Sequence, residues 1–500
     1  MASAPGQFLI PQPDIVFTAP AGAGAFGWSA STDGTVIAGL CSTGVAIYAR
    51  TGVAPTWVLQ GVAPMPAGNE VAVAVDGERL VATEWFALAY PQGVAQVFRR
   101  SGSEWIEEAV LAPQPGPADD SFGGPADIDG DTLVLAGSRD GAGGCVFVFT
   151  RGASGWSQRA AFAAGDTLPG DQFGCAVALD DGVLVVGAQA ADVAGAVDAG
   201  AAYVFTGCGA DWTQQAKLAG PAPGGSFGYA VAVDGDTVLV GAPTADTPAA
   251  PRAGAAYVFA RSGGSWTLQG ILASPIGESD DLAGFSVALD GDRAISGAPW
   301  ASDPFGTPLA GAAQRYTRQD GIWSYWGAYQ SPDPGGYGTN LGGAVSLGAD
   351  SVVAVAPGPP TATLHVFLEV PLYIDMPTWL DLGYGLAGVA GVPRLSGSGT
   401  LQAGSPGELL LEQAAPDAPV LGLIALAQTP MPFKGGTLVP LPVQSPIFSS
   451  TSGSGIWRAH WNALPGGIPL STPFYVQFAV ADAAAPNGVA LSNALAGITH

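Results

Sequence analysis

Carboxylates are the side chains of this 500-residue chain most able to do chemistry, since Asp and Glu number 41 against 16 Lys and Arg. Three of them alternate around a turn, as Asp127, Asp129 and Asp131. Oxygen ligands suit calcium, so these three aspartates are our candidate metal ligands. The segment has no closing carboxylate downstream, and Asp-Gly also forms tight turns without any metal. A calcium site and purely structural turn aspartates therefore both remain open.

Acid–base chemistry has weaker support. The three histidines, His365, His460 and His500, are far apart in the sequence, and no catalytic helix or nucleophile motif surrounds them. Adjacent carboxylates such as Glu107 and Glu108 point to opposite faces of a strand, so they make poor catalytic pairs. Glycine-rich spacings are frequent among 74 glycines, but none opens a helix, which argues against nucleotide binding. These residues favour a non-enzymatic protein over an enzyme.

The elements that position these residues belong to a repeat, clearest at residues 227–259. Asp234-Gly235 is a strong hairpin signal, because both residues tolerate the backbone of a tight turn. Val238–Val240 is apolar without alternation, which predicts a strand buried on both faces. Ala255–Phe259 is a third strand, and the segment from Trp266 is a fourth. Each repeat therefore predicts four antiparallel strands.

Seven copies of this unit follow one another at spacings of 43 to 58 residues. A four-stranded unit at this period predicts the blade of a β-propeller. The positions equivalent to Phe227 are Phe26, Asn69, Phe122, Phe173, Phe227, Ala283 and Leu341. The last copy lacks its fourth strand, and Phe8–Ala19 supplies one at the N-terminus. We therefore expect an all-β, seven-bladed propeller over residues 1–370, in which the first strand closes the last blade and removes the open edges.

One rim of such a ring collects the loops after the second strands and the connections between blades. Loops of this kind carry function more often than the scaffold does. An aromatic ring there could stack on a sugar, although Trp85 and Trp300 could also cap their own blades. The candidate binding residues on this rim are Glu84, Trp85, Asp192, Asp198, Asp246, Trp300 and Asp303. The fourth-strand tryptophans, by contrast, are expected to pack between blades.

The motif FG-x-x-VA-x-DGD-x-x-x-VGAP, followed by GAAYVF and a Trp, resembles the FG-GAP family of repeats in its short bacterial form. The resemblance covers roughly residues 8–370 and is strongest in the fourth to sixth copies. It implies a seven-bladed propeller similar to the integrin α-subunit head, and export from the cell. Family members usually carry a calcium loop of the form D-x-[DN]-x-DG-x-x-D, from which this sequence departs.

Residues 371–500 differ in character from the repeats. Short apolar or alternating runs such as Glu408–Glu412, Val420–Ala427 and Phe474–Ala481 are separated by Pro, Gly and Ser, which predicts a β-sandwich. The pattern G-L-A-G-x-x-G-x-P-x-L, with GGTLVPLP and LSNAL, resembles a C-terminal module on exported planctomycete-like and myxobacterial-like proteins. That resemblance implies a role in attachment, sorting or packing.

The net charge of −25 argues against nucleic acid and anionic membrane surfaces as partners. No apolar span is long enough for a transmembrane helix, and the first residues lack the pattern of a signal peptide. Four cysteines allow three disulfide pairings or none, and no zinc motif is present: Cys41, Cys145, Cys175 and Cys208. The regular repeats and the acidic rim favour a recognition or adhesion protein that binds a protein or glycan, and the family resemblance implies that it is secreted or on the cell surface.

Two alternatives remain at the level of sequence. One is a secreted hydrolase or lyase whose site lies at the propeller mouth. The other is a structural surface or assembly subunit, for which the C-terminal module would provide attachment. The sequence leaves the oligomeric state open.

Overall fold

The computed structural model describes residues 14–498, apart from gaps at 52–55, 66–68, 86–91, 113–121, 140–141, 221–223, 276, 303–308, 331–338, 359–361, 369–378, 384–386, 388–390, 400–406, 426–427, 434–435, 441–444, 462–472, 484, 486–488 and 493. Every named element in the described part of the chain is a β-strand. The chain divides into two compact units, one of them Pro11–Glu369 and the other containing Val370–His500.

The first unit contains seven four-stranded antiparallel sheets among its described residues, which we number 1 to 7 along the chain. Sheets 1 to 4 are formed by β2 (Phe26–Thr32), β3 (Val36–Cys41), β4 (Gly44–Thr51) and β5 (Thr56–Pro64); β6 (Asn69–Asp76), β7 (Arg79–Trp85), β8 (Val94–Ser101) and β9 (Glu104–Leu111); β10 (Ala126–Asp129), β11 (Thr132–Arg139), β12 (Ala142–Gly152) and β13 (Gly155–Phe162); and β14 (Phe173–Asp180), β15 (Val183–Ala188), β16 (Ala201–Cys208) and β17 (Asp211–Ala219). Sheets 5 to 7 are formed by β18 (Ala230–Asp234), β19 (Thr237–Ala242), β20 (Ala255–Ser262) and β21 (Ser265–Leu272); β22 (Ser286–Asp290), β23 (Arg293–Ala298), β24 (Ala312–Gln319) and β25 (Ile322–Tyr329); and β26 (Ala344–Gly348), β27 (Ser351–Ala356), β28 (Thr363–Leu368) and β1 (Asp14–Thr18).

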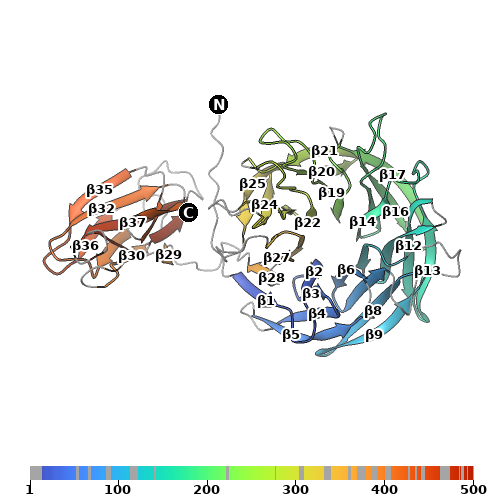
Figure 1. Cartoon of the computed structure of the whole chain (residues 1–500), viewed down its shortest axis with the longest axis horizontal. Coiled ribbons are helices and arrows are strands. Elements are labelled where there is room, and N and C mark those ends of the chain that lie inside the picture. The colour runs from blue at the N-terminus through green and yellow to red at the C-terminus, as the bar shows by residue number, and fades with distance from the viewer. Residues whose placement is uncertain are drawn as a thin grey trace. The chain divides into compact units, whose positions relative to one another are not determined.

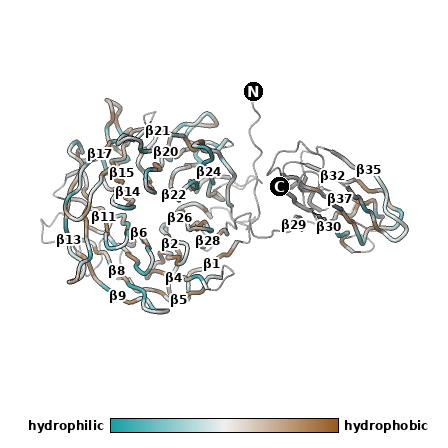
Figure 2. The backbone as a smooth tube through the Cα atoms, turned by 180° about the vertical axis from the view of Figure 1, so that it is seen from behind, coloured by the Kyte–Doolittle hydropathy of each residue, from teal (hydrophilic) through white to brown (hydrophobic). Residues whose placement is uncertain are grey.

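The innermost strands of these sheets form a closed ring. Each first strand contacts that of the next sheet, in the order β2, β6, β10, β14, β18, β22 and β26, and β26 returns to β2. The sheets radiate outward from this ring, as Figure 1 shows, and Figure 2 gives the same ring from behind. The repeated four-stranded sheets therefore fit a β-propeller.

Ring closure uses the N-terminal strand, as expected. Strand β1 pairs antiparallel with β28, from Asp14 opposite Phe367 to Thr18 opposite Thr363. The remainder of the predicted closing segment, residues 8–13, lies outside the described residues. Phe17 on β1 stacks against Tyr48 of sheet 1 with ring centroids 4.1 Å apart, so the closing strand also contributes to packing between sheets.

The interior agrees with the apolar runs of the repeat. All six residues of β19 are buried, because sheets pack on both of its faces. The hydrophobic clusters combine neighbouring sheets; one of them joins Val185 of sheet 4 to Val240 of sheet 5, with Trp266 packed against it. Five other fourth-strand tryptophans also lie in or against such clusters: Trp57, Trp105, Trp156, Trp212 and Trp323. The prediction that these tryptophans pack between sheets is confirmed.

Two glycines of the FG and GAP motifs allow neighbouring sheets to approach closely. Gly228 has a φ of 91°, and a Cβ placed on it would lie 2.2 Å from the carbonyl oxygen of Ala201 in sheet 4. A Cβ on Gly241 would lie 2.1 Å from the carbonyl oxygen of Gly284, at the start of sheet 6. Real Cβ atoms do not come so close to backbone oxygens, so both positions require glycine.

The second unit is described by itself. Its six-stranded sheet consists of β29 (Trp379–Gly383), β39 (Ala494–Ile498), β37 (Pro473–Ala481), β32 (Pro419–Ala425) and β35 (Ser445–Ser450), with β38 (Val489–Leu491) paired to β37. A three-stranded sheet consists of β30 (Arg394–Gly399), β31 (Gly407–Glu412) and β36 (Trp457–Trp461), and a hairpin of β33 (Gln428–Phe433) and β34 (Gly436–Pro440). Leu411 and Trp457 of the smaller sheet share a buried cluster with Val476 and Phe478 of the larger one.

Candidate functional site

The loops after the second strands meet the connections between sheets on one side of the ring, which we call the loop rim. Parallel bridges join Gly200 to Phe227, Gly254 to Ala283, and Gly311 to Leu341. In each bridge, the first residue precedes a third strand and the second precedes the next sheet. An ion pair of 2.6 Å between Arg252 Nε and Asp280 Oδ1 also joins the loop after β19 to the connection between sheets 5 and 6. These contacts confirm that the two kinds of loop share a rim in sheets 4 to 6.

The predicted loop aspartates hold their own loops in shape. Asp192 Oδ1 accepts a hydrogen bond of 3.0 Å from the backbone N–H of Asp198. Asp246 Oδ1 accepts one of 2.9 Å from the backbone N–H of Arg252, which occupies the equivalent position in the next repeat. Asp198 itself adopts a φ of 51°. The two loops are therefore closed by the same aspartate turn, and each carboxylate keeps its second oxygen for other contacts.

The other predicted rim residues differ in accessibility. Strand β7 runs through Trp85, so Glu84 lies in a strand and not in a loop, and its side chain is fully buried. Trp85 and Trp300 are 41% and 42% exposed. Asp303 lies outside the described residues. Both tryptophans are thus accessible on the rim, whereas Glu84 is not.

The candidate metal ligands lie on the opposite side of the ring from the loop rim, at the hairpin between β10 and β11. Asp127 Oδ2 accepts a hydrogen bond of 2.8 Å from the backbone N–H of Leu179, and Asp129 Oδ2 accepts one of 2.8 Å from the N–H of Asp181. Asp131 instead faces Arg79 and Arg151, at 3.5 Å and 3.6 Å. The three carboxylates therefore have different partners, and no group of three or more His, Cys, Asp or Glu side chains that could hold a metal occurs among the described residues.

Burial raises the pKa of Asp127 to about 7, against two backbone hydrogen bonds that lower it and the nearby charges of Asp129 and Asp76 that raise it further. Because the pKa is raised, the native protein keeps Asp127 protonated between about pH 3.9 and pH 7, where the unfolded chain has already lost this proton. The contribution of Asp127 to stability is therefore most favourable below the unfolded pKa of about 3.9 and declines as the pH rises toward 7.

The hairpin aspartates of successive repeats form a series of contacts between sheets. Asp76 accepts a hydrogen bond of 2.6 Å from the N–H of Gly130, and Asp180 accepts one of 2.6 Å from the N–H of Gly235. Asp129 bonds Asp181 in the same way, and Asp234 bonds Gly291. Each aspartate thus reaches from its own hairpin to the hairpin of the next sheet. This repetition gives the Asp-Gly motif a structural role beyond the turn itself.

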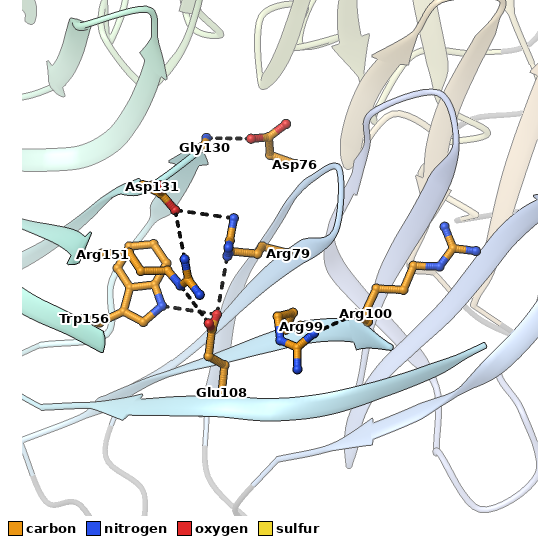
Figure 3. A network of polar contacts seen from close by, with 9 residues as sticks. All are labelled: Asp76, Arg79, Arg99, Arg100, Glu108, Gly130, Asp131, Arg151 and Trp156. Carbon is orange, nitrogen blue, oxygen red and sulfur yellow. Dashed lines mark hydrogen bonds and ion pairs between the residues drawn. The ribbon is translucent and has the colours of Figure 1, made fainter. Parts of the chain in front are cut away.

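A cluster of charged residues strengthens one of these boundaries, between sheets 2 and 3 (Figure 3). Glu108 accepts hydrogen bonds from Arg151 Nε at 2.8 Å and from Trp156 Nε1 at 3.3 Å, and it pairs with Arg79 Nε at 3.4 Å. Its partial burial would raise the pKa of its carboxyl, but the hydrogen bonds from Arg151 and Trp156 and the charges of Arg151 and Arg79 outweigh that effect and lower it.

We expect Glu108→Gln to destabilise the protein by about 1 kcal/mol at pH 7, since a charged hydrogen-bonded pair is lost. A lowered folded-state pKa stabilises the protein above the unfolded pKa of about 4.3, and this contribution disappears as the pH falls through the folded value. Urea unfolding at a series of pH values should therefore show the gap between parent and variant closing in acid. Glu104→Gln, at an exposed position of the same strand, is the matched control. If the difference in unfolding free energy between parent and Glu108→Gln stayed constant down to about pH 2, the ionised Glu108 carboxylate would not be the source of the stabilisation.

Sequence reasoning did not identify the side chains that line the central channel. The residue after the FG pair, or after the two residues equivalent to it, lines the channel in five sheets: Trp28 in sheet 1, Cys175 in sheet 4, Tyr229 in sheet 5, Phe285 in sheet 6 and Gly343 in sheet 7. Together with neighbouring residues of the innermost strands they line a cavity of about 510 Å³. This position varies among the copies, whereas the residues on either side of it are repeated. That contrast could have identified it as a position that faces the channel and not the core.

Three of these residues form an aromatic arc, which we define as Trp28, Phe285 and Tyr229. The ring centroids of Trp28 and Phe285 are 5.7 Å apart, and those of Phe285 and Tyr229 are 4.9 Å apart. Sheet 7 lies between Trp28 and Phe285, and a Cβ on Gly343 would lie 2.8 Å from Cε3 of Trp28. The absence of a side chain at Gly343 therefore lets the indole lie across that sheet. Trp28 remains 51% exposed.

The remaining chemistry-bearing residues have structural surroundings. All four cysteines carry thiols, with Cys41 and Cys145 buried, Cys175 half-buried and Cys208 exposed. Burial raises the pKa of the Cys175 thiol to about 12, so it is neutral and poorly nucleophilic. His365 is buried and shares a hydrogen bond of 2.8 Å with Thr363 Oγ1. Among the described residues, no helix is long and apolar enough to cross a membrane.

Comparison with known proteins agrees with the repeat at two places. A family model described as FG-GAP repeat matches residues 156–205 and residues 212–259. Each match begins at the tryptophan of an outer strand and ends in the third strand of the next sheet, so a repeat spans the boundary between two sheets. No curated protein matches the chain. The chain is thus an all-β protein that carries FG-GAP repeats on a β-propeller.

Proposed function

We propose that the chain is an extracellular or cell-surface recognition or adhesion protein whose loop rim binds a protein or glycan partner. The observation that carries this proposal is the exposure of three tryptophans at the rim and the adjoining channel: Trp28, Trp85 and Trp300 are 51%, 41% and 42% exposed. Tryptophan is enriched at the energetic centres of interfaces, since it offers a large rigid surface. FG-GAP repeats are themselves typical of adhesion and recognition proteins.

The finer architecture is also part of this proposal. We infer a seven-bladed propeller of integrin-like form over residues 1–370, on the basis of the seven sheets and the closing strand β1. Residues 371–500 would form a β-sandwich that attaches or sorts the protein, supported by the core shared between its two larger sheets. Secretion is expected from the resemblance of both parts to exported proteins.

The test is binding of the labelled full-length chain to a glycan array and to a panel of extracellular proteins. We expect saturable binding of at least one partner that weakens at least tenfold in the double variant Trp85→Ala, Trp300→Ala, since two rim anchors are lost. Ile106→Ala is the matched control, because this side chain is 47% exposed on an outer strand away from the rim. Binding that is unchanged in the double variant would count against the loop rim.

Calcium is a second part of the proposal, motivated by a net charge of −25. Ions that bind the native state alone raise its stability by mass action. We expect millimolar calcium to raise the melting temperature more than sodium does at matched ionic strength. Loss of that difference in the triple variant Asp192→Asn, Asp198→Asn, Asp246→Asn would place the ion at the rim, and loss in Asp129→Asn, Asp131→Asn would place it at the hairpin. Equal shifts from both salts would reject calcium binding.

A further inference from the structure

The cavity at the loop-rim end of the channel is lined without charge. Its described lining residues include no Asp, Glu, Lys, Arg or His, in a chain with 41 acidic residues. An anionic ligand would meet the repulsion of the whole acidic protein, and a cationic one would find no carboxylate partner in the lining. The electrostatics of this cavity therefore favour a neutral ligand.

The aromatic arc provides one kind of contact for such a ligand. Trp28 is held by Phe285 on one side and lies over the bare backbone of Gly343, while about half of its surface stays open. A large, pre-positioned indole face loses little conformational freedom when a flat apolar surface stacks on it. A ligand that uses this face needs a patch of C–H groups.

The polar groups of the lining add a second requirement, because a ligand must form hydrogen bonds with them. Ser286 Oγ donates to the carbonyl oxygen of Gly342 at 2.8 Å and so offers lone pairs, whereas Ser29 Oγ accepts from the N–H of Val73 at 3.0 Å and so offers its O–H. Gln189 Nε2 donates to Gln172 Oε1 at 2.6 Å, which leaves its own carbonyl oxygen as an acceptor. The lining thus presents donors and acceptors together, which matches hydroxyl groups, since each hydroxyl both donates and accepts.

We propose that this cavity binds a neutral sugar ring, stacked on Trp28 and hydrogen-bonded through its hydroxyls to Gln189, Ser29 and Ser286. A pyranose combines an uncharged apolar face with a rim of hydroxyls, and this is the combination that the lining offers. The cavity of about 510 Å³ is within the range of about 300–1,000 Å³ that is usual for small-molecule sites. The proposal rests on the recognition function above and specifies its ligand class.

The test uses the full-length chain and defined trisaccharides, which are too short to cover the rest of the rim. Neutral gluco-, galacto-, manno- and xylo-trisaccharides are compared with an oligogalacturonate and a chitosan trimer, by saturation-transfer NMR and calorimetry. We expect at least one neutral trisaccharide to bind, and the charged ones to bind at least tenfold more weakly or not at all. Absence of binding by every neutral trisaccharide, or tighter binding of a charged one, would overturn the proposal.

Two variants locate the site. Trp28→Ala should weaken binding at least tenfold by removing the stacking face. Gly343→Ala keeps the indole but displaces it, because its Cβ would lie 2.8 Å from Trp28, and it should also weaken binding. Ile106→Ala is the control, as this exposed side chain lies on the outer strand β9 and outside the cavity lining, and it should bind as the parent does. Circular dichroism and melting temperature confirm that each variant is folded.

The outcomes separate this inference from the proposed function. Sugar binding that survives Trp28→Ala but is lost in Trp300→Ala would overturn the channel site and leave rim recognition intact. A protein partner that depends on Trp85 and Trp300, with no trisaccharide bound, would do the same. If the full-length chain bound no partner on the array or in the protein panel and no trisaccharide, both proposals would be overturned.

Discussion

Deletion of residues 1–19 is expected to unfold the whole ring in one cooperative step. The deletion removes β1, leaves the edge of β28 without its five-residue partner, and takes Phe17 from the packing between sheets 7 and 1. Because every innermost strand contacts the next, a gap at one boundary removes support from both of its neighbours. Thermal unfolding followed by circular dichroism should show a melting temperature at least ~10 °C lower, or no cooperative transition, since loss of a few kcal/mol is a large part of total stability.

Point variants on β1 separate closure from a general effect of the N-terminus. Phe17→Ala removes a ring that stacks on Tyr48 and should cost about 2–4 kcal/mol, as for other partly buried aromatic truncations. Val16→Ala lies on the same strand, is 42% exposed, and should change stability by less than about 0.5 kcal/mol. A truncated chain that melts like the parent, or equal effects of the two substitutions, would show that β1 does not hold the ring closed.

Substitution of Gly241 by alanine is expected to destabilise the protein more than a single methyl group normally does. The added Cβ would lie 2.1 Å from the carbonyl oxygen of Gly284, and this obstacle is backbone, which cannot rotate away as a flexible side chain could. Either the boundary between sheets 5 and 6 opens or the strand shifts, and overpacking of this kind costs about 1–3 kcal/mol or more. Urea unfolding should report this as a lower midpoint with little change in slope.

Gly152→Ala is the control for Gly241→Ala. A Cβ at position 152 meets nothing within 4 Å, and the residue is exposed at the end of β12. Alanine there should leave stability within about 0.5 kcal/mol of the parent. If both alanines had the same small effect, the sheets would be able to separate without cost, and close approach would not explain why the GAP motif contains glycine.

The repeat made the fold predictable from sequence, because its signals are local and recur. Asp234-Gly235 and the apolar run after it predicted a hairpin and a buried strand, and β18 and β19 flank that turn with β19 wholly buried. The closing strand could be predicted as well, since a missing fourth strand in the last copy matched an extra strand at the N-terminus. In the second unit, the predicted strands Glu408–Glu412 and Phe474–Ala481 correspond to β31 and β37, each of which begins one residue earlier.

The candidate site was only partly predictable. Trp85 and Trp300 were placed on an accessible rim, but Glu84 was expected beside them and lies buried, because β7 extends further than its apolar run indicated. The hairpin aspartates were expected to form turns or bind a metal, and their contacts with the next sheet became visible only when the sheets stood side by side.

By itself, the sequence determined the strands, their turns, the order of the sheets and the way in which the ring closes, because each depends on residues near one another or on a regular period. Only the tertiary structure decided which side chains face the channel. Trp28 and Phe285 are more than 250 residues apart in the sequence, yet their ring centroids lie 5.7 Å from each other across Gly343. Closure of the ring brings the first sheet beside the last. No local sequence pattern encodes which side chains of these distant segments then meet at the channel.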